Sequence, residues 1–219
     1  MDRNRRLQAI ILKKYPIGDS HDGIILLTEK EGLQSTIAHG ARSAKGRLRG
    51  QVPLFASGIF DIYTNPVKKS NKIIDIQLLT EYPGIRESIE KFYTASLWAE
   101  IALKTHAGGQ AAAFVFSLME SGLALLDICA DDQVRSLSIH YLLHWLEGVG
   151  GIAEPETRNL PSEIRSCLDD FLHSELYDFT KHQLHIANQR KILGWCYHMI
   201  EAELETHLNT LKTGAGIIV

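Results

Sequence analysis

The hydrophobic repeat of this chain changes once, near Tyr82, and that change constrains the fold more than any other feature of the sequence. Before Tyr82, short segments rich in β-branched residues alternate with turn residues, a pattern typical of strands. After it, apolar residues such as Ile85, Ile89 and Phe92 recur every three or four positions, a pattern typical of helices. The sequence therefore predicts the α+β multidomain class, with a β domain over residues 1–80 and an all-α helical domain over residues 81–219.

The β domain is predicted to contain five strands. They cover residues 7–14, 23–29, 33–39, 53–64 and 72–79, with Gly, Asp, Asn, Pro and Ser residues in the turns between them. A sandwich usually needs about seven strands, so a closed barrel fits better. We expect an N-terminal five-stranded barrel of the oligonucleotide/oligosaccharide-binding (OB) type, with an SH3-like barrel as the alternative.

Helix-starting and helix-ending residues divide the second domain. Pro83 opens the first predicted helix, and Gly108 and Gly109 end it. Further helices are predicted over 110–129, from Asp131 or Asp132 to the glycines at 148–151, from Pro161 and Ser162 onwards, and once or twice within 181–211. A loop is expected over 152–160, and the terminal TGAGIIV is expected to fray.

Composition excludes several protein classes. Hydrophobic residues make up 45% of the 219 residues and charged residues 22%, as in an ordinary globular protein. The stretch 111–128 contains Ser117, Glu120, Ser121 and Asp127, and the first residues lack a signal-peptide pattern, so we expect a cytoplasmic protein without a membrane segment. Three distant cysteines without a CxxC motif favour neither a disulfide framework nor a zinc site.

Charge is distributed unevenly along the chain. Residues 1–75 carry 13 Lys or Arg and seven Asp or Glu, a net charge of +6, whereas residues 76–219 carry a net charge of −9. A basic segment of this size is typical of a domain that binds a polyanion, because cations placed against phosphates release condensed counterions. The alternative is an ordinary solvated charged surface.

Three basic clusters in the β domain are candidate DNA-binding residues. In HGARSAKGRLRGQ (39–51), four cations stand among small residues on an expected flexible loop, where they could follow a phosphate backbone. The connections after the first and fourth strands frame the binding groove of an OB barrel. A lysine cluster lies at each of these connections, so both clusters are further candidates. We expect Phe55 and Phe60 in the core and Tyr15 as a possible stacking residue. The predicted DNA-binding residues are Arg42, Lys45, Arg47, Arg49, Lys68, Lys69, Lys72, Lys13 and Lys14.

Motifs of enzymes and cofactor sites are absent from the sequence. It contains no GxxxxGK, GxSxG or HExxH, and its glycine cluster at 148–151 follows a predicted helix. The pairs His140/His144 and His182/His185 have helical spacing but no neighbouring Cys ligand, so we expect no metal. Acidic pairs such as Asp131/Asp132 stand next to predicted helix starts, a position that favours helix capping over a magnesium site. We therefore predict neither catalysis nor a cofactor.

In the acidic helical domain, a groove for an acidic, apolar partner peptide would need a cation beside it. Few cations are available there. Arg135 and Lys104 are the candidates, with Arg165 and Lys181 as further options.

The run YPIGDSHDGIILLTEKEGLQSTIAHGARSAKGRL (15–48) resembles the amino-terminal signature of the bacterial RecO family. It has a turn with Gly, an acidic residue and Ser, a strand ending in Thr-acidic-x-x-Gly, and a strand ending in Gly-Ala-Arg with a nearby Lys. The likeness continues through Pro53, Leu54 and Phe55 and more loosely through FYTASLWAEI (92–101), and LETHLNTLKT is similar to the family's closing helix.

This resemblance implies a function. RecO-like proteins bind single- and double-stranded DNA, anneal complementary strands, contact the acidic C-terminal tail of single-stranded DNA-binding protein, and act with RecR to load RecA. Arg42 and Lys45 lie on the matching motif. Many relatives carry a four-cysteine zinc module, but GVGGIAEPETRNLPSEIRSC offers only Cys167, so we expect the zinc module to be absent. The rival hypothesis is a non-catalytic protein-interaction adaptor whose OB-like barrel has no nucleic-acid affinity.

Overall fold

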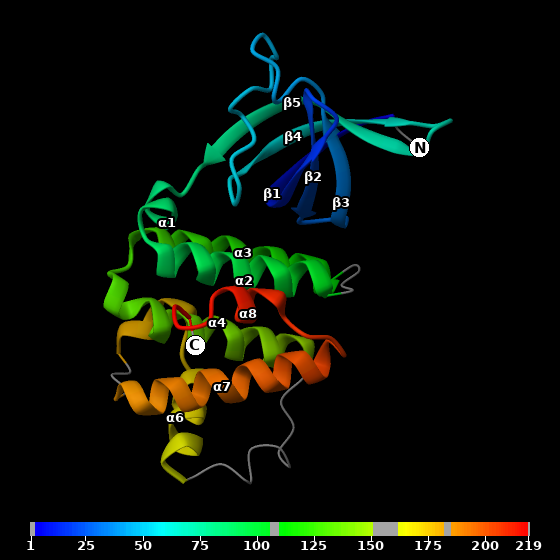
Figure 1. Ribbon diagram of the computed structural model, residues 1–219. Helices are drawn as coiled ribbons and strands as arrows, with labels where there is room; N and C mark the ends of the chain where they lie inside the picture. The colour runs from blue at the N-terminus through cyan, green and yellow to red at the C-terminus, as the bar shows by residue number, and fades with distance from the viewer. Residues whose placement is uncertain (1–2, 106–109, 151–161, 182–184, 219) are drawn as a thin grey trace. The chain divides into compact units, whose positions relative to one another are not determined.

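The computed structural model describes residues 3–105, 110–150, 162–181 and 185–218. Five strands close into a barrel in the order β1-β2-β3-β5-β4, which confirms the predicted OB-type fold (Figure 1). The strands are β1 (Asn4–Ile17), β2 (His21–Thr28), β3 (Gly32–Ala38), β4 (Ser57–Asn65) and β5 (Ser70–Thr80). All neighbouring strands are antiparallel except β3 and β5, which pair in parallel through Thr36–Asn71 and Ile37–Lys72.

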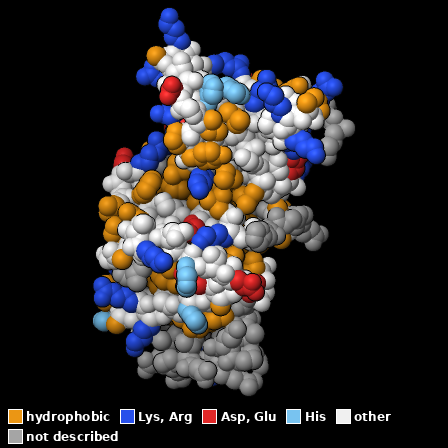
Figure 2. Space-filling model, turned by 45° about the vertical axis from the view of Figure 1, so that its right-hand side comes forward, with side chains coloured by type: hydrophobic (Ala, Val, Ile, Leu, Met, Phe, Trp, Pro, Cys, Tyr) orange, Lys and Arg blue, Asp and Glu red, His pale blue; other side chains and the backbone are white. Residues whose placement is uncertain are grey.

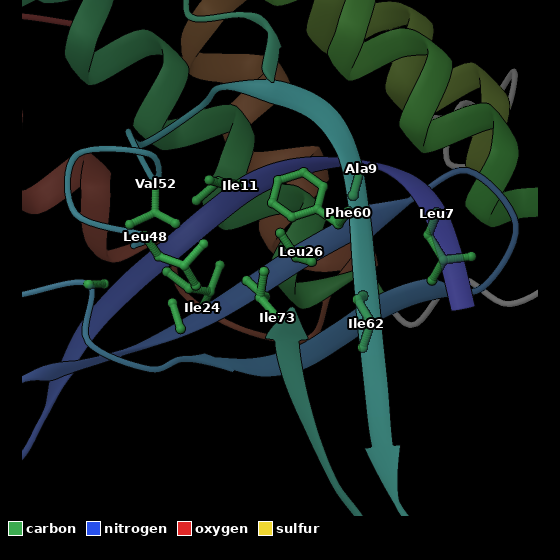
Figure 3. Packing of buried hydrophobic residues seen from close by; sticks show 12 residues of the cluster. Leu7, Ala9, Ile11, Ile24, Leu26, Leu48, Val52, Phe60, Ile62 and Ile73 are labelled. Atoms are coloured by element: carbon green, nitrogen blue, oxygen red, sulfur yellow. The ribbon is translucent and has the colours of Figure 1, made fainter. Parts of the chain in front are cut away.

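Alternation along the strands fills the barrel with apolar side chains. Leu7, Ala9 and Ile11 of β1 point inward together with Ile24 and Leu26 of β2 (Figure 3). Phe60, Ile62 and Ile73 complete the cluster from β4 and β5. Phe55 and Phe60 are both buried, as predicted.

The helices follow Tyr82, where the sequence predicts the change of period. They are α1 (Pro83–Glu87), α2 (Ile89–Lys104), α3 (Gln110–Ile128), α4 (Val134–Val149), α6 (Ser162–Leu172), α7 (Ile186–Glu203) and α8 (Asn209–Thr213), with the 3-10 turns η1 (Asp131–Gln133) and η2 (Leu176–Thr180). The first predicted helix is interrupted at Ser88, whose extended backbone separates α1 from α2. The predicted loop over 152–160 lies outside the described residues.

Contacts divide the chain into two compact units. Unit 1 comprises residues 1–82 and 106–120, and unit 2 comprises residues 83–105 and 121–219. Within unit 2, α4 contacts α2, α6 and α7, and the rings of Trp98 and Tyr141 stack 3.9 Å apart in its core. Within unit 1, Glu120 Oε1 of α3 accepts hydrogen bonds from Gln8 Nε2 and Ser57 Oγ of the barrel strands.

Helix α3 differs from its sequence-based expectation. Its window Ala111–Ile128, of mean hydropathy 1.6, is long and apolar enough to span a membrane by length and composition, so Glu120 and Asp127 do not exclude such a span. However, 44% of that window is buried, including Met119, Leu123 and Leu126. Both carboxylates also accept hydrogen bonds, Glu120 from the barrel and Asp127 from the Gly84 N–H. These contacts are those of a core helix.

The C-terminal tail is also ordered where fraying was predicted. Ile218 is 4% exposed, and its carbonyl accepts a hydrogen bond of 2.9 Å from the hydroxyl of Tyr197 in α7. The expectation of a frayed tail is therefore wrong for residues 213–218, because the tail supplies an apolar side chain and an acceptor to unit 2.

Candidate nucleic-acid interface

The connection between β3 and β4, residues 39–56, is compact, whereas the sequence suggested a flexible loop. Successive backbone hydrogen bonds, such as Ser43 N–H to Gly40 O and Gly46 N–H to Ser43 O, form it from consecutive turns. Gly46 lies so close to Gly40 that an added Cβ would stand 1.8 Å from the Gly40 carbonyl oxygen. Ala41, Leu48 and Val52 anchor the connection because they are buried in the barrel core (Figure 3).

The four cations of this connection point to solvent. Arg42, Lys45, Arg47 and Arg49 are all exposed, while Leu48 between the last two is buried. The guanidinium of Arg42 donates to Gly18 O at 3.2 Å, and its backbone N–H donates to Ser20 O, so Arg42 is held beside the β1–β2 turn. The connection therefore presents its cations from a fixed backbone.

The other two arginines of the connection, Arg47 and Arg49, also have partners within unit 1. Arg49 Nη1 donates to Ala44 O at 3.1 Å, within the same connection. Arg47 lies 3.6 Å from the Asp75 carboxylate of β5, and both side chains are more than half exposed. An exposed ion pair of this kind contributes about 0–1 kcal/mol, so a phosphate can compete for Arg47.

The three β4–β5 lysines fall into two environments. Lys68 and Lys69 are exposed in the turn, where Asn65 Oδ1 accepts the backbone N–H groups of Val67 and Lys68. Lys72 belongs to β5, and its Nζ lies 4.8 Å from the centroid of the Tyr63 ring. This distance is within the range of a cation–π contact. Lys72 is therefore held on the sheet, apart from the turn lysines.

A bulge precedes the two predicted lysines of β1. The register of β1 against β2 shifts between Ile11 and Lys13, after which Lys13 pairs with Ile25 and Lys14 pairs with Ile24. Ile24 belongs to the barrel core, so Lys13 and Lys14 leave opposite faces of the strand. Only Lys13 leaves on the same face as Tyr15, whose ring covers Gly23.

Directly paired residues share a face of a sheet, so the register identifies one row across the outside of the barrel. The row runs from Tyr15 through Gly23, Ile37 and Lys72 to Tyr63. Ile37 points outward because Thr36 and Ala38 beside it are buried. This face of β1, β2, β3, β5 and β4 offers two aromatic rings with a lysine between them.

A histidine pair lies on the same face and was missed by sequence reasoning. The rings of His21 and His39 meet edge to face with centroids 4.7 Å apart, and His21 Nδ1 accepts the Gly40 N–H at 3.0 Å. Histidine side chains adjoin Lys and Arg side chains on the barrel (Figure 2). Burial, His21 and Lys72 together lower the pKa of His39. No linear motif reports this pair, because β2 and β3 separate its members along the chain.

Two further barrel cations, Arg5 and Arg6, have acidic partners. Arg5 pairs with Glu31 and also donates to Thr64 and Asn71, and Arg6 lies 4.0 Å from Asp61. The predicted residues thus fall into four groups. Lys13 and Lys72 lie on the outer face, and Lys14 lies on the opposite face of β1. Arg42, Lys45, Arg47 and Arg49 belong to the β3–β4 connection, and Lys68 and Lys69 to the β4–β5 turn.

The cations expected beside a partner-peptide groove are paired within unit 2. Arg135 lies 3.3 Å from Glu90, and Lys181 lies 2.7 Å from Asp178. Lys104 lies 2.9 Å from Glu100 and also donates to the His207 carbonyl. These contacts fix helix ends and helix pairs. A partner carboxylate would have to displace an existing one at each of these three sites.

The described residues contain no group of three or more His, Cys, Asp or Glu that could hold a metal ion. His140 is buried with its ring 4.3 Å from Phe171 and 6.2 Å from His144. Gly150 ends α4 in a left-handed conformation, as the helix-stop interpretation of the glycine cluster requires. His182 and most of the segment compared with the zinc module lie outside the described residues.

Comparison with known proteins agrees with the barrel. Residues 1–82 match the family model described as Recombination protein O N terminal. The chain is 29% identical over 150 residues to the DNA repair protein RecO of Acaryochloris marina, covering 68% of this chain and 50% of that protein. The RecO proteins of Gloeobacter violaceus and Gloeothece citriformis are each 26% identical, covering 68% and 77% of this chain and 56% of each relative.

The chain thus spans about half the length of the curated relatives it matches. The matched region extends past the barrel into the helices, and the family model covers the barrel itself. Residues 1–82 therefore form a barrel that matches the RecO amino-terminal family model, and the chain is similar to RecO proteins over the barrel and part of the helices.

Proposed function

We propose that this protein binds DNA through the outer face and the β3–β4 connection of its barrel, and that it acts in recombinational DNA repair. The carrying observation is the OB-type barrel whose exposed cations stand on a fixed connection and beside two outward tyrosines. Cations of this kind bind phosphates, and aromatic rings stack on unpaired bases. The similar proteins are named as DNA repair proteins, which supports the repair role.

The similarity to RecO proteins supports a more detailed role. In this proposal, residues 1–80 are the nucleic-acid-binding domain and residues 81–219 the helical domain of a non-enzymatic mediator. The mediator anneals complementary strands in the RecF pathway and acts with RecR and the tail of single-stranded DNA-binding protein to load RecA. We place it in the cytoplasm, associated with the nucleoid. A protein partner would bind unit 2 near Arg135 or Lys104. One of its carboxylates would take the place of Glu90 or Glu100 in the ion pair.

The proposal is tested by fluorescence titration of labelled single-stranded and duplex oligonucleotides over a salt series. Neutralisation of about five phosphates predicts that log affinity for single strands falls with log salt at a slope near −3.5. Replacing Arg42, Lys45, Arg47 and Arg49 by Gln should weaken binding at least tenfold at 0.1 M salt and make the slope shallower.

A matched control separates local contacts from net charge. Lys181, Arg190, Lys191 and Lys212 are exposed cations of unit 2, so replacing them by Gln gives the same change of net charge. The control should keep wild-type affinity and slope. A wild-type slope near zero, or equal losses in both variants, would contradict the proposal and favour a protein-interaction adaptor.

A further inference from the structure

The histidine pair on the barrel suggests how its DNA affinity is regulated, an inference that rests on the function proposed above. Residues 1–82 contain only two histidines, His21 and His39, and the fold brings both rings together. Lys72 is paired with Ile37, two residues before His39, so Lys72 and His39 leave the same face of the sheet. Three nitrogen-bearing side chains thus gather at one end of the outer row.

The hydrogen bonds give the two imidazoles different roles. His21 Nδ1 accepts the Gly40 N–H at 3.0 Å and lies 3.2 Å from the Ser20 hydroxyl. Because Nδ1 of His21 accepts the Gly40 N–H, Nε2 is the nitrogen of this ring that can donate a hydrogen bond to a ligand. His39 is exposed, and its ring is the one that can gain a proton without breaking this contact.

The remaining neighbours are mainly cationic. Lys72 comes from β5, and Arg42, from the connection, is bound to Gly18 O and Ser20 O next to His21. Two acidic residues flank this turn: Asp22 is buried, and Asp19 is exposed in the turn itself. Without a ligand, burial and the nearby Lys72 ammonium disfavour a charged His39, in agreement with its lowered pKa.

We propose that His39, His21 and Lys72 form a phosphate subsite for the nucleic-acid backbone, and that a bound phosphate draws a proton onto His39. A phosphodiester would accept hydrogen bonds from the protonated His39, from His21 Nε2–H and from the Lys72 ammonium. Its negative charge offsets the repulsion between Lys72 and a charged His39. Binding and proton uptake are therefore coupled, and the barrel holds DNA more tightly as pH falls.

The test measures affinity for a rhodamine-labelled oligothymidine from pH 8 to pH 5.5 at constant ionic strength. Wild-type protein should bind about threefold to tenfold more tightly at pH 5.5 than at pH 7.5, the range expected when part of one proton is taken up on binding. His39→Gln should abolish most of this dependence while leaving binding at pH 8 within about twofold. Since His39 is exposed, the substitution should not unfold the barrel.

Three further measurements define the outcome. His207→Gln alters an exposed histidine of unit 2 and should keep the wild-type pH dependence. Lys72→Gln should weaken binding across the whole range. In NMR titrations, the pKa of His39 should rise when oligothymidine or inorganic phosphate is added, and oligothymidine should produce the larger rise.

The possible results separate this inference from the proposed function. Affinity independent of pH, with the salt slope intact, would overturn the histidine subsite and leave DNA binding in place. A pH dependence that survives His39→Gln would overturn it as well. Failure to bind oligothymidine at any pH would remove both proposals.

Discussion

Gly122 lies in α3 beside the stacked rings of Trp98 and Tyr141, where no larger residue fits. An added Cβ would lie 2.7 Å from Cδ2 of Tyr141 and 3.0 Å from Cζ3 of Trp98. Both rings are fully buried and have no free space in which to move. Overpacking costs about 1–3 kcal/mol, which exceeds the roughly 1 kcal/mol that alanine gains over glycine in a helix. We expect Gly122→Ala to lower the free energy of unfolding, measured by urea denaturation.

Gly194 of α7 provides the control for this substitution. It is exposed, and an added Cβ would meet nothing within 4 Å. Gly194→Ala should therefore raise the free energy of unfolding by up to about 1 kcal/mol through helix propensity alone. Equal stabilisation by both substitutions would show that the Trp98–Tyr141 stack adapts to a methyl group.

Single residues differ in how far the sequence alone predicts their environment. The burial of Phe55 and Phe60 follows from their positions in an apolar segment. Which of Lys13 and Lys14 leaves the outer face depends on a bulge between Ile11 and Lys13 that no residue type indicates. The contact of His21 with His39 depends on how β2 and β3 pair. Residue type and local spacing therefore predict burial better than they predict which surface groups meet.

Among the elements, the strands and long helices follow the sequence closely, and the connections do not. The five predicted strands all form, because alternation and turn residues are local signals. The β3–β4 connection looks flexible in sequence, since Gly and basic residues dominate it, but Ala41, Leu48 and Val52 bury themselves in the barrel. Such anchoring comes from contacts with distant strands, which a single sequence does not display.

The short helix α8 is attached to α2 by one carboxylate. Glu100 Oε1 accepts the Asn209 N–H and Glu100 Oε2 accepts the Thr210 N–H, each at 2.8 Å, and Lys104 lies beside them. Burial raises the pKa of Glu100, but the hydrogen bonds from Thr210, Lys104 and Asn209 outweigh it and hold the pKa at about 2, compared with the usual 4.5. The ionised carboxylate therefore stabilises the folded chain.

Because the pKa of Glu100 is lowered on folding, its contribution is fully present above pH 4.5 and disappears as pH falls toward 2. We expect Glu100→Gln to lower the free energy of unfolding most at pH 7, with a difference from wild type that shrinks below pH 4.5. Urea denaturation at several pH values measures this. Glu203→Gln, on an exposed position of α7, should change stability by no more than about 0.5 kcal/mol. A constant difference for Glu100→Gln would contradict the assignment.

The two compact units carry opposite net charges. Unit 1 holds 13 basic and nine acidic residues, a net charge of +4, and unit 2 holds ten basic and 17 acidic residues, a net charge of −7. The division of charge was visible in the sequence, but the assignment of residues 106–120 to the barrel unit was not, because it depends on the packing of α3. A protein with a net charge of −3 can attract DNA only through this uneven distribution.

The distance over which each charge acts depends on the salt concentration. The Debye length is about 10 Å at 0.1 M salt and about 30 Å at 0.01 M. At 0.1 M and above, a bound phosphate interacts mainly with the cations that it touches, whereas near 0.01 M charges up to about 30 Å away also contribute, acidic ones included. We therefore expect the plot of log affinity against log salt to be straight above 0.1 M and to flatten near 0.01 M. Fluorescence titration extended to low salt measures this curvature.

A variant of unit 2 tests whether its charge causes the flattening. Asp132, Glu175 and Glu203 are exposed, so replacing them by Asn, Gln and Gln removes three negative charges without disturbing the core. Affinity should rise several-fold at 0.01 M salt and rise much less at 0.2 M, because salt screens charges over a shorter distance there. An equal gain at both salt concentrations would mean that these carboxylates lie within a Debye length of the bound DNA even at 0.2 M. No gain at either would show that the acidic unit exerts no field on the strand, so that the contacts of the barrel alone set the affinity.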